Sequence, residues 1–345
     1  MQTEITAPMD LLDSQGHITE PGWARQPYWH YDRKQIKAGW HRIKEWDYYA
    51  ILSHDKGVGV TLTMSDLGYA GAFAICWLDF NTGYYHQVDT MTLLPRGKTG
   101  FSAGSSDGKI VHSDKKLSIE FACEGGLRTL RFDAPGIVDA QGKTGISGSI
   151  VLRQPKGFES MNIATSWSED RRAFYYNRKI NCMPASGEIQ TGSGRVELDP
   201  NTDFGCLDWG RGRWTYKNRW YWSSASGLVD NVPFGWNLGY GFSDRTPASE
   251  NVIFYDNKAH KLQDVTFHFD AKDYMKPWRF TSSDERLDMV FDPVMDRNSS
   301  FNVWLIRSIQ HQVFGYFTGS ARLDNGTIIK INRFPGFAED VLNWW

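Results

Sequence analysis

The sequence contains little cysteine, and its four cysteines are widely separated: Cys76, Cys123, Cys182 and Cys206. Because no C-x-x-C pair occurs, the sequence excludes a zinc ribbon and a thioredoxin-like redox motif. Isolated cysteines behave as small buried hydrophobic side chains, and free thiols are typical of reducing compartments. We therefore expect free, buried thiols and a cytoplasmic protein.

Long apolar runs and a strong net charge are also absent. No stretch of about eighteen apolar residues occurs, so the sequence predicts no transmembrane helix, and the polar residues 1–13 predict no signal peptide. The 345 residues include 38 basic and 40 acidic side chains, a net charge of −2. This balance argues against nucleic acid as a partner. Basic residues alternate with Trp40 and Trp46, which leaves a peripheral membrane contact open.

Signatures of metal and nucleotide binding are missing as well. The nine histidines lack the H-x-x-x-H and H-E-x-x-H spacings of metal sites. Gly97-Lys98-Thr99 and Gly142-Lys143-Thr144 resemble the end of a phosphate-binding loop without its leading glycine, and Gly210-x-Gly212 lacks the third glycine of a dinucleotide site. No G-x-S-x-G nucleophile elbow occurs. We expect no cofactor and no metal, although ligands from distant strands could still assemble a metal site.

Short alternating segments dominate the chain. Apolar side chains occupy every second position in Lys116–Phe121, Val265–Phe269 and Leu287–Phe291, which is typical of half-buried strands. Asp107-Gly108 and Asn325-Gly326 are hairpin signals. We predict an antiparallel all-β protein, a barrel or a sandwich, with few short helices. The two candidate helices are Tyr31–Arg42 and Gly336–Trp345.

A weak repeat suggests two similar β-units. Trp46-Asp47-Tyr48-Tyr49 precedes a glycine-rich strand and Ser65-Asp66, and Trp220-Tyr221-Trp222 precedes a glycine-rich strand and Ser243-Asp244. We expect one unit over residues 1–160 and another over residues 188–345, with a crossover at 161–187.

The segment from Asp208 to Trp222 carries the densest chemistry. It combines one carboxylate, Asp208, with Arg211 and Arg213 and with four tryptophans: Trp209, Trp214, Trp220 and Trp222. Arginine pairs with carboxylates and stacks on aromatic rings, so we expect Asp208 to be buried against Arg211 or Arg213. The pair could line a ligand site, or it could be structural and organise the end of a barrel.

Two further polar residues are candidates for the same site. Glu250 follows a glycine-rich strand, and His311 lies in a strand-like run on the face opposite Gln310 and Gln312. We predict Asp208 as the first catalytic acid and Glu250 as the second. The arginines, the four tryptophans and His311 are predicted to contact the ligand.

The residues resemble those of the domain-of-unknown-function family 2804. The matching motifs include Leu207-Asp208-Trp209-Gly210-Arg211-Gly212, Gly235-x-Asn237-x-Gly239, Glu250-Asn251 and His311-Gln312-x-Phe314-Gly315. That family is distantly similar to the group of AttH, hydroxyneurosporene synthase and tocopherol cyclase. The resemblance implies two tandem lipocalin-like (calycin) β-barrels, an apolar ligand such as an isoprenoid or polyene, and no cofactor. No catalytic residue can be carried over from that group.

Two functions are compatible with these features. In the first, a buried carboxylic acid protonates an apolar alkene and aromatic rings stabilise the resulting cation, as in a lyase, hydratase or cyclase. In the second, the same aromatic-lined cavity carries a lipid without chemistry. Carbohydrate binding is a third alternative, because tryptophan faces also stack on sugars.

Overall fold

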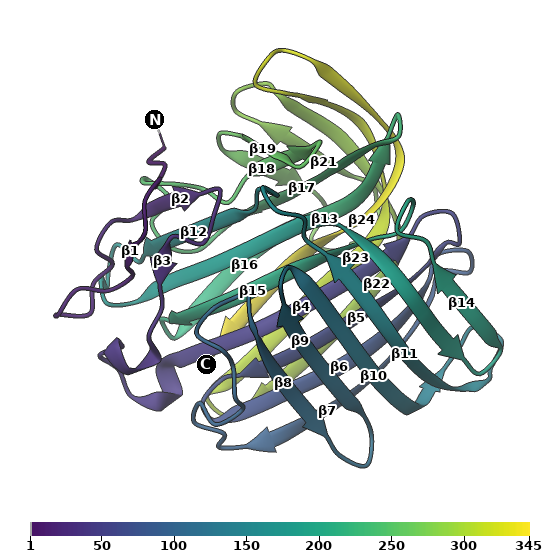
Figure 1. The fold of residues 1–345 in the computed structure, drawn as a ribbon, viewed down its shortest axis with the longest axis horizontal. Coiled ribbons are helices and arrows are strands. Elements are labelled where there is room, and N and C mark those ends of the chain that lie inside the picture. Colours follow the sequence, from purple (N-terminus) through teal and green to yellow (C-terminus); the bar gives the residue numbers. More distant parts are fainter. Residues whose placement is uncertain (1) are drawn as a thin grey trace.

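The computed structural model describes residues 2–345 and consists almost entirely of antiparallel strands (Figure 1). Within that range, the only helical segments are two short 3-10 turns, η1 (Arg33–Gln35) and η2 (Trp40–Arg42), which replace the helix expected over Tyr31–Arg42. None of the helical segments in the described range is long and apolar enough to cross a membrane. The all-β prediction is confirmed.

The first large sheet has thirteen strands and curls into a half-barrel (Figure 1). Its main path runs β7-β6-β5-β4-β15-β13-β11-β10-β9-β8, with β2, β12 and β14 attached beside it. A separate parallel pair consists of β1 and β3, which precede and follow β2 in the chain. The bounds are β1 (Met9–Asp10), β2 (Gly22–Ala24), β3 (Trp29–His30), β4 (Ile43–Ser53), β5 (Val58–Asp66), β6 (Ala70–Asp79), β7 (Tyr84–Leu93), β8 (Gly108–Ser113), β9 (Ser118–Glu124), β10 (Leu127–Val138), β11 (Thr144–Arg153), β12 (Met161–Ser166), β13 (Phe174–Thr191), β14 (Gly194–Leu198) and β15 (Phe204–Arg213).

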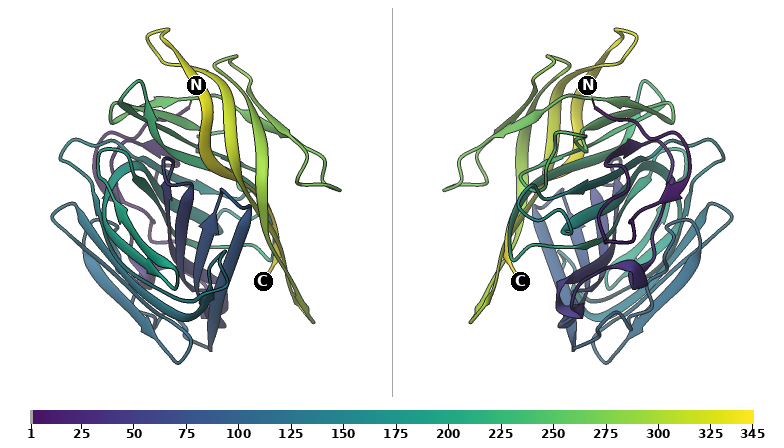
Figure 2. Two further views of the ribbon diagram at one scale, coloured as in Figure 1. Left: turned by 90° about the vertical axis from the view of Figure 1, so that its right-hand side faces the viewer. Right: turned by 90° about the vertical axis from the view of Figure 1, so that its left-hand side faces the viewer.

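The second large sheet has nine strands in the order β19-β18-β17-β16-β24-β23-β22-β21-β20. Figure 2 shows that it lies against one side of the first sheet and curls away from it. Both sheets are lipocalin-like half-barrels. The bounds are β16 (Lys217–Val229), β17 (Val232–Tyr240), β18 (Val252–Tyr255), β19 (Lys258–Lys261), β20 (Val265–His268), β21 (Trp278–Ser282), β22 (Leu287–Val303), β23 (Ile306–Arg322) and β24 (Ile328–Trp344).

Two local expectations are wrong. The C-terminal segment Gly336–Trp345 is not a helix, because β24 pairs along most of its length with β16 on one side and β23 on the other. Such pairing outweighs a weak local preference for helix. Asp107-Gly108 does not form a hairpin turn, because β7 and β8 lie at opposite ends of the first sheet. Asn325-Gly326 does connect a hairpin, β23 to β24.

The change from one sheet to the other occurs between Arg213 and Lys217. The second half of β13, together with β14 and β15, still belongs to the first sheet, although the sequence suggested a second unit from residue 188. The reason is that β15 fills the position between β4 and β13, and it pairs with both along its whole length. A strand in the middle of the path cannot leave the sheet without exposing two rows of backbone hydrogen-bonding groups.

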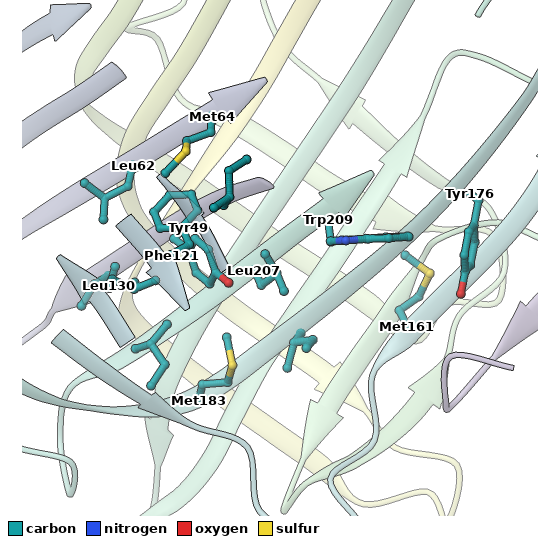
Figure 3. Packing of buried hydrophobic residues seen from close by; sticks show 14 of the residues in the cluster. Tyr49, Leu62, Met64, Phe121, Leu130, Met161, Tyr176, Met183, Leu207 and Trp209 are labelled. Carbon is teal, nitrogen blue, oxygen red and sulfur yellow. The ribbon is translucent and has the colours of Figure 1, made fainter. Parts of the chain in front are cut away.

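Three apolar cores result from this arrangement. The first occupies the concave interior of the first half-barrel, where Figure 3 shows Tyr49, Phe121 and Leu207 close together and Trp209 farther along the same interior, toward Tyr176. The second fills the second half-barrel and is rich in phenylalanine. The third lies between the two sheets and includes Tyr48, Trp222 and Phe337. We call this layer between the sheets the seam.

Candidate functional site

The two faces of β15 divide the predicted site residues. Successive side chains of a strand point to opposite faces, so Asp208 faces the seam while Trp209 and Arg211 face the interior of the first half-barrel. Gly210, on the seam face, leaves room for the Trp46 ring, because a Cβ atom at this position would lie 2.1 Å from Trp46 Cζ2. Glycine within a strand often marks such a close approach.

Asp208 is buried, but its predicted partner is wrong. Its Oδ2 atom pairs with Lys179 Nζ at 2.7 Å, and its Oδ1 atom accepts a hydrogen bond from Asn177 Nδ2 at 2.6 Å. Arg211 instead pairs with Asp47 at 2.9 Å, and Arg213 pairs with Asp170 at 2.9 Å. Side chains at positions whose numbers differ by an odd number point to opposite faces of a strand. Neither arginine of β15 can therefore reach Asp208 directly.

A chain of polar contacts runs through the seam from Lys179 to Glu250. The Lys179 ammonium lies 3.9 Å from the centroid of the Trp222 ring, a cation–π contact. Trp222 Nε1 donates to Asn237 Oδ1 at 2.7 Å, and Asn237 Nδ2 donates to the backbone carbonyl of Glu250 at 2.9 Å. Trp222 is therefore held in one orientation between the two predicted acids.

Glu250, at the end of this series of polar contacts, is a buried carboxyl group. Burial raises its pKa, the Lys179 charge lowers it, and the Asp208 charge raises it again, with a net upward shift. Tyr175 Oη lies 3.4 Å from Glu250 Oε2. Gly239 is required opposite this side chain, because a Cβ atom there would lie 2.1 Å from Glu250 Oε1.

Glu339 is a third buried acid that the sequence analysis missed. Burial raises its pKa to about 7, against the opposing effects of Arg297 and Lys179. Trp220 Nε1 lies 3.4 Å from its Oε2 atom, and Gln312 donates to Oε1. In the sheet register, Glu339 lies opposite Trp222 on one neighbouring strand and opposite Gln312 on the other. The position of the Glu339 carboxyl group is apparent only from this strand pairing, because the sequence predicted a helix for this segment.

Aromatic rings extend from these acids toward the surface. Trp214 is at the centre, with ring centroids of Trp167 at 5.2 Å, Trp46 at 5.7 Å and Trp220 at 5.8 Å. Phe242 and Trp345 complete this group at 5.3 Å and 5.9 Å. We call it the aromatic cluster. Its members Trp46, Trp220, Phe242 and Trp345 are half-buried, so the cluster has one exposed side and one side near the acids.

A buried lysine borders the aromatic cluster. Lys44 Nζ donates to the carbonyl oxygens of His41 at 2.9 Å and Leu67 at 2.8 Å, and it lies 5.2 Å from the Trp345 ring. Burial lowers the pKa of Lys44 to about 7. No residue near Lys44 along the chain indicates that its side chain is buried, so the sequence alone does not identify it as a candidate.

The remaining predicted residues lie elsewhere. His311 is on the other face of β23, stacked on Tyr274 at 3.8 Å and bonded through Nδ1 to Asp296 at 2.8 Å. The seam therefore brings together Asp208, Glu250 and Trp222, with Trp220 and Trp214 in the adjoining cluster. It does not include Trp209, Arg211, Arg213 or His311.

Two hollows lie in the first half-barrel. A cavity of about 20 Å³, partly open to solvent, lies beside Trp209, and an open hollow of about 560 Å³ lies over β9, β10, β11 and β13. Neither is lined by Trp214, Trp220 or Trp222, so neither is the tryptophan-lined cavity expected from the sequence. In residues 2–345, no group of three histidine, cysteine, aspartate or glutamate side chains is arranged to hold a metal ion.

The seam contains the parts needed for proton transfer next to apolar material. Glu339 and Glu250 are carboxyl groups whose pKa is raised by burial, so each can carry a proton nearer to neutral pH than an exposed carboxyl group. Trp220 and Trp222 present ring faces that favour a positive charge, as the position of Lys179 over Trp222 demonstrates.

Comparison with known proteins gives the fold and the family. An AttH-like protein from Nitrosomonas europaea superposes with a TM-score of 0.53 at 13% identity, covering 87% of this chain and 92% of that one. The structure of CghA with Sch210972 superposes with a TM-score of 0.51 at 13% identity, covering 97% of each chain. Kievitone hydratase from Nectria haematococca, at 11% identity and 88% coverage of each chain, has a TM-score of 0.48.

The first two similarities show a shared lipocalin-like fold. No curated protein matches the sequence. The family model described as "Domain of unknown function (DUF2804)" matches residues 2–345, nearly the whole chain, and the chain therefore belongs to this family.

Proposed function

We propose that the protein binds an apolar ligand, an isoprenoid, polyene or other lipid, at the aromatic cluster and the adjoining seam. The cluster supplies a large apolar surface, part of which is exposed, and the polar groups next to it are few and fixed in position. This combination is typical of small-molecule sites. Binding requires the half-buried rings of Trp220, Phe242 and Trp345 to separate, because the seam is packed.

We further propose that the site performs cofactor-independent acid catalysis on the bound ligand, as a lyase, hydratase or cyclase. The observation that carries this proposal is the position of Glu339, a buried carboxyl group with its pKa raised to about 7 beside Trp220. Such a group is protonated in a large fraction of molecules near neutral pH and can donate its proton to an alkene. Aromatic faces then stabilise the cation that forms.

The three acids have different roles in this proposal. Glu339 is the proton donor and Glu250 is the second acid. Asp208 forms an ion pair with Lys179 at 2.7 Å and accepts a hydrogen bond from Asn177, so both of its oxygen atoms already have partners. Its role is to hold Lys179 against Trp222. The acid predicted first from the sequence therefore becomes a positioning residue.

The binding step is tested by titrating the protein with retinoid, carotenoid and fatty-acid probes while following tryptophan fluorescence. We expect at least one class to quench the wild type saturably and Trp220→Ala to weaken that binding. Trp304→Ala is the matched control, because Trp304 is 98% exposed on the turn between β22 and β23 and is not a member of the cluster. If no probe binds, or if both variants lose affinity equally, the proposed site is wrong.

The catalytic step is tested on the ligand that copurifies with the protein, identified by organic extraction and mass spectrometry. The enzyme hypothesis predicts turnover by the wild type, and it predicts that Glu339→Gln abolishes turnover while binding is retained. The carrier hypothesis predicts binding without turnover in both proteins. Burial of Trp209, Trp214 and Trp222 disfavours carbohydrate binding, which needs flat exposed rings.

A further inference from the structure

The hairpin that joins β22 to β23 carries a group of exposed apolar side chains. Their exposed fractions are 45% for Phe301, 50% for Val303, 98% for Trp304 and 73% for Leu305. We call residues 301–306 the hairpin tip. Single exposed apolar residues are common on soluble proteins, but several large ones together mark a surface that binds a protein, a ligand or a membrane.

The hairpin tip projects from the body of the protein. Figure 2 shows the β22–β23 hairpin extending past the rest of the second sheet, on the side where the C-terminus lies. In the register of the sheet, Trp344 at the end of β24 pairs with Arg307, and no residue of β24 within the described range pairs with Ile306. The neighbouring strand therefore ends before the tip, and the apolar side chains of the tip face solvent.

The turn at the hairpin tip does not require a tryptophan. Trp304 has a φ angle of +54°, a left-handed backbone conformation that bulky side chains rarely adopt. Two-residue hairpin turns favour glycine and asparagine at such positions. Trp304 therefore neither packs into a core nor eases the turn, and its placement points to a contact of its ring with something outside the folded chain.

Basic side chains lie at the base of the hairpin tip. Lys217 Nζ lies 4.5 Å and Arg307 Cζ lies 5.3 Å from the centroid of the Trp344 ring. The sequence has no acidic residue from 297 to 323, which includes the tip and Arg307, and none from 209 to 229, which includes Lys217. The chain as a whole has a net charge of −2, so this positive region is a local feature that suits an anionic partner.

A second exposed apolar segment borders the aromatic cluster. Residues 91–94, at the end of β7, include three apolar side chains that are at least 50% exposed. The backbone N–H of Leu94 donates to the Tyr69 carbonyl at 2.9 Å. Lys44 Nζ lies 4.3 Å from the Tyr69 ring and 5.2 Å from the ring of Trp345, a member of the cluster. This segment therefore reaches the cluster through Tyr69 and Lys44.

The hairpin tip reaches the cluster at the same ring. Tyr216 Oη donates to the Leu305 carbonyl, and the backbone N–H of Trp345 donates to the Tyr216 carbonyl at 2.9 Å. Both exposed apolar segments are thus linked to Trp345, one through Lys44 and the other through Tyr216. Arg96, whose Cζ lies 4.8 Å from the Trp40 ring, adds a positive charge beside residues 91–94.

We propose that the hairpin tip docks the protein on an anionic lipid bilayer, with Trp304 and Leu305 inserted at the headgroup level and Lys217 and Arg307 on the anionic headgroups. Tryptophan is enriched at membrane–water interfaces because its ring is amphipathic. Basic residues next to inserted apolar side chains add electrostatic attraction to anionic lipids. The docking residues lie outside the aromatic cluster, so this proposal does not rest on the function proposed for the seam.

The test is co-sedimentation of the whole chain with vesicles of phosphatidylcholine and phosphatidylserine, compared with vesicles of phosphatidylcholine alone. We expect the wild type to bind the anionic vesicles more tightly and to lose binding as salt is added. Joint replacement of Trp304 and Leu305 by alanine should weaken binding roughly tenfold or more. Arg307→Gln should weaken it about fivefold, the usual contribution of one basic residue near an anionic surface.

Two control substitutions lie at the opposite end of β24 from Trp344. Ile328→Ala removes an exposed apolar side chain, and Lys330→Gln removes an exposed positive charge. Both variants should bind vesicles as the wild type does. The substituted side chains of the tip are exposed, so those variants lose no core contact and should fold.

Trp304→Ala also separates docking from ligand binding at the cluster. It should weaken vesicle binding and leave the binding of the soluble apolar probes unchanged, whereas Trp220→Ala should have the reverse effects. The proposal is overturned if the wild type does not bind anionic vesicles, if it binds neutral vesicles equally well, or if the tip variants bind like the wild type. A dimer that dissociates in Trp304→Ala, without any vesicle binding, would overturn it in favour of contact between two copies of the tip.

Discussion

The interiors of the two half-barrels differ in chemistry although their strands are arranged in the same way. The first encloses a network in which Arg211 pairs with Asp47 and Arg33 with Glu45, in addition to the unpaired Arg128 and Arg178. The second is filled by fully buried rings: Phe234, Trp236, Trp278, Phe280, Phe291, Phe317 and Phe334. Its charged group, Arg219 with Asp340, lies at one end and contacts Tyr274.

The difference shows that the fold alone does not decide what a lipocalin-like half-barrel can hold. An interior filled with aromatic rings offers few polar groups that could recognise a ligand, because the charged groups of the second half-barrel lie at one end. A half-barrel with buried charges selects for a polar or anionic solute. The proposed lipid site lies outside both interiors, at the aromatic cluster and the seam between the two sheets.

The prediction with the largest expected effect tests whether the stability of the first half-barrel depends on the ion pairs in its interior. Asp47→Ala removes the nearer acid, at 2.9 Å, from Arg211, whose side chain is fully buried, and leaves only Glu45 at 3.9 Å. Breaking a buried pair in this way costs about 3–5 kcal/mol, which we expect to see as a lower free energy of unfolding in urea titrations. Asp288→Ala breaks an exposed pair with Arg279 and should leave the free energy of unfolding nearly unchanged. Equal effects of the two substitutions would contradict the comparison.

The second prediction concerns the pH dependence of stability that Glu339 gives to the seam. Its pKa is about 7 in the folded protein and 4.5 in the reference state, so the folded state retains a proton that the unfolded state releases. The resulting stabilisation is present below pH 4.5 and is lost as pH rises toward 7, by about 3 kcal/mol in total. Glu339→Gln should flatten this dependence in urea titrations between pH 4.5 and 7. The exposed Glu188→Gln should retain the wild-type slope; a wild-type slope in Glu339→Gln would show that another group causes it.

A smaller effect tests the contact between β15 and the aromatic cluster. In Gly210→Ala, the new Cβ atom would lie 2.1 Å from Trp46 Cζ2, so the ring must shift. We expect a loss of about 1–3 kcal/mol, the usual cost of overpacking, together with a changed tryptophan fluorescence spectrum. Gly194→Ala on β14 meets no atom within 4 Å and serves as the control. A silent Gly210→Ala would mean that Trp46 is loosely packed.

The smallest effect tests the apolar interior of the second half-barrel. Ile331→Val removes one methylene group from a side chain that is 2% exposed in this core. The expected cost is about 0.5–1.5 kcal/mol, measured as a shift of the urea midpoint with an unchanged slope. The same substitution at the exposed Ile328 should be nearly neutral. No loss at Ile331 would indicate that the second core is not tightly packed.

The sequence predicted the structural features that depend on residues close together in the chain. Alternation located strands within 287–291, and Asn325-Gly326 located a hairpin. It also predicted that Asp208 is buried. It failed where the partner comes from a distant strand, as for Lys179 with Asp208 and for Glu339 in the seam, because no spacing along the chain encodes which strands become neighbours.

The sequence by itself determined the fold class, because period-two alternation and turn residues act over a few neighbouring positions. It also determined that charge and aromatic rings are concentrated near β15. The tertiary structure alone decided which charges meet, since β15 lies between β4 and β13 and sends adjacent residues to opposite faces. For this reason Asp208 became part of the seam, while Arg211 became part of an interior that also holds two unpaired arginines.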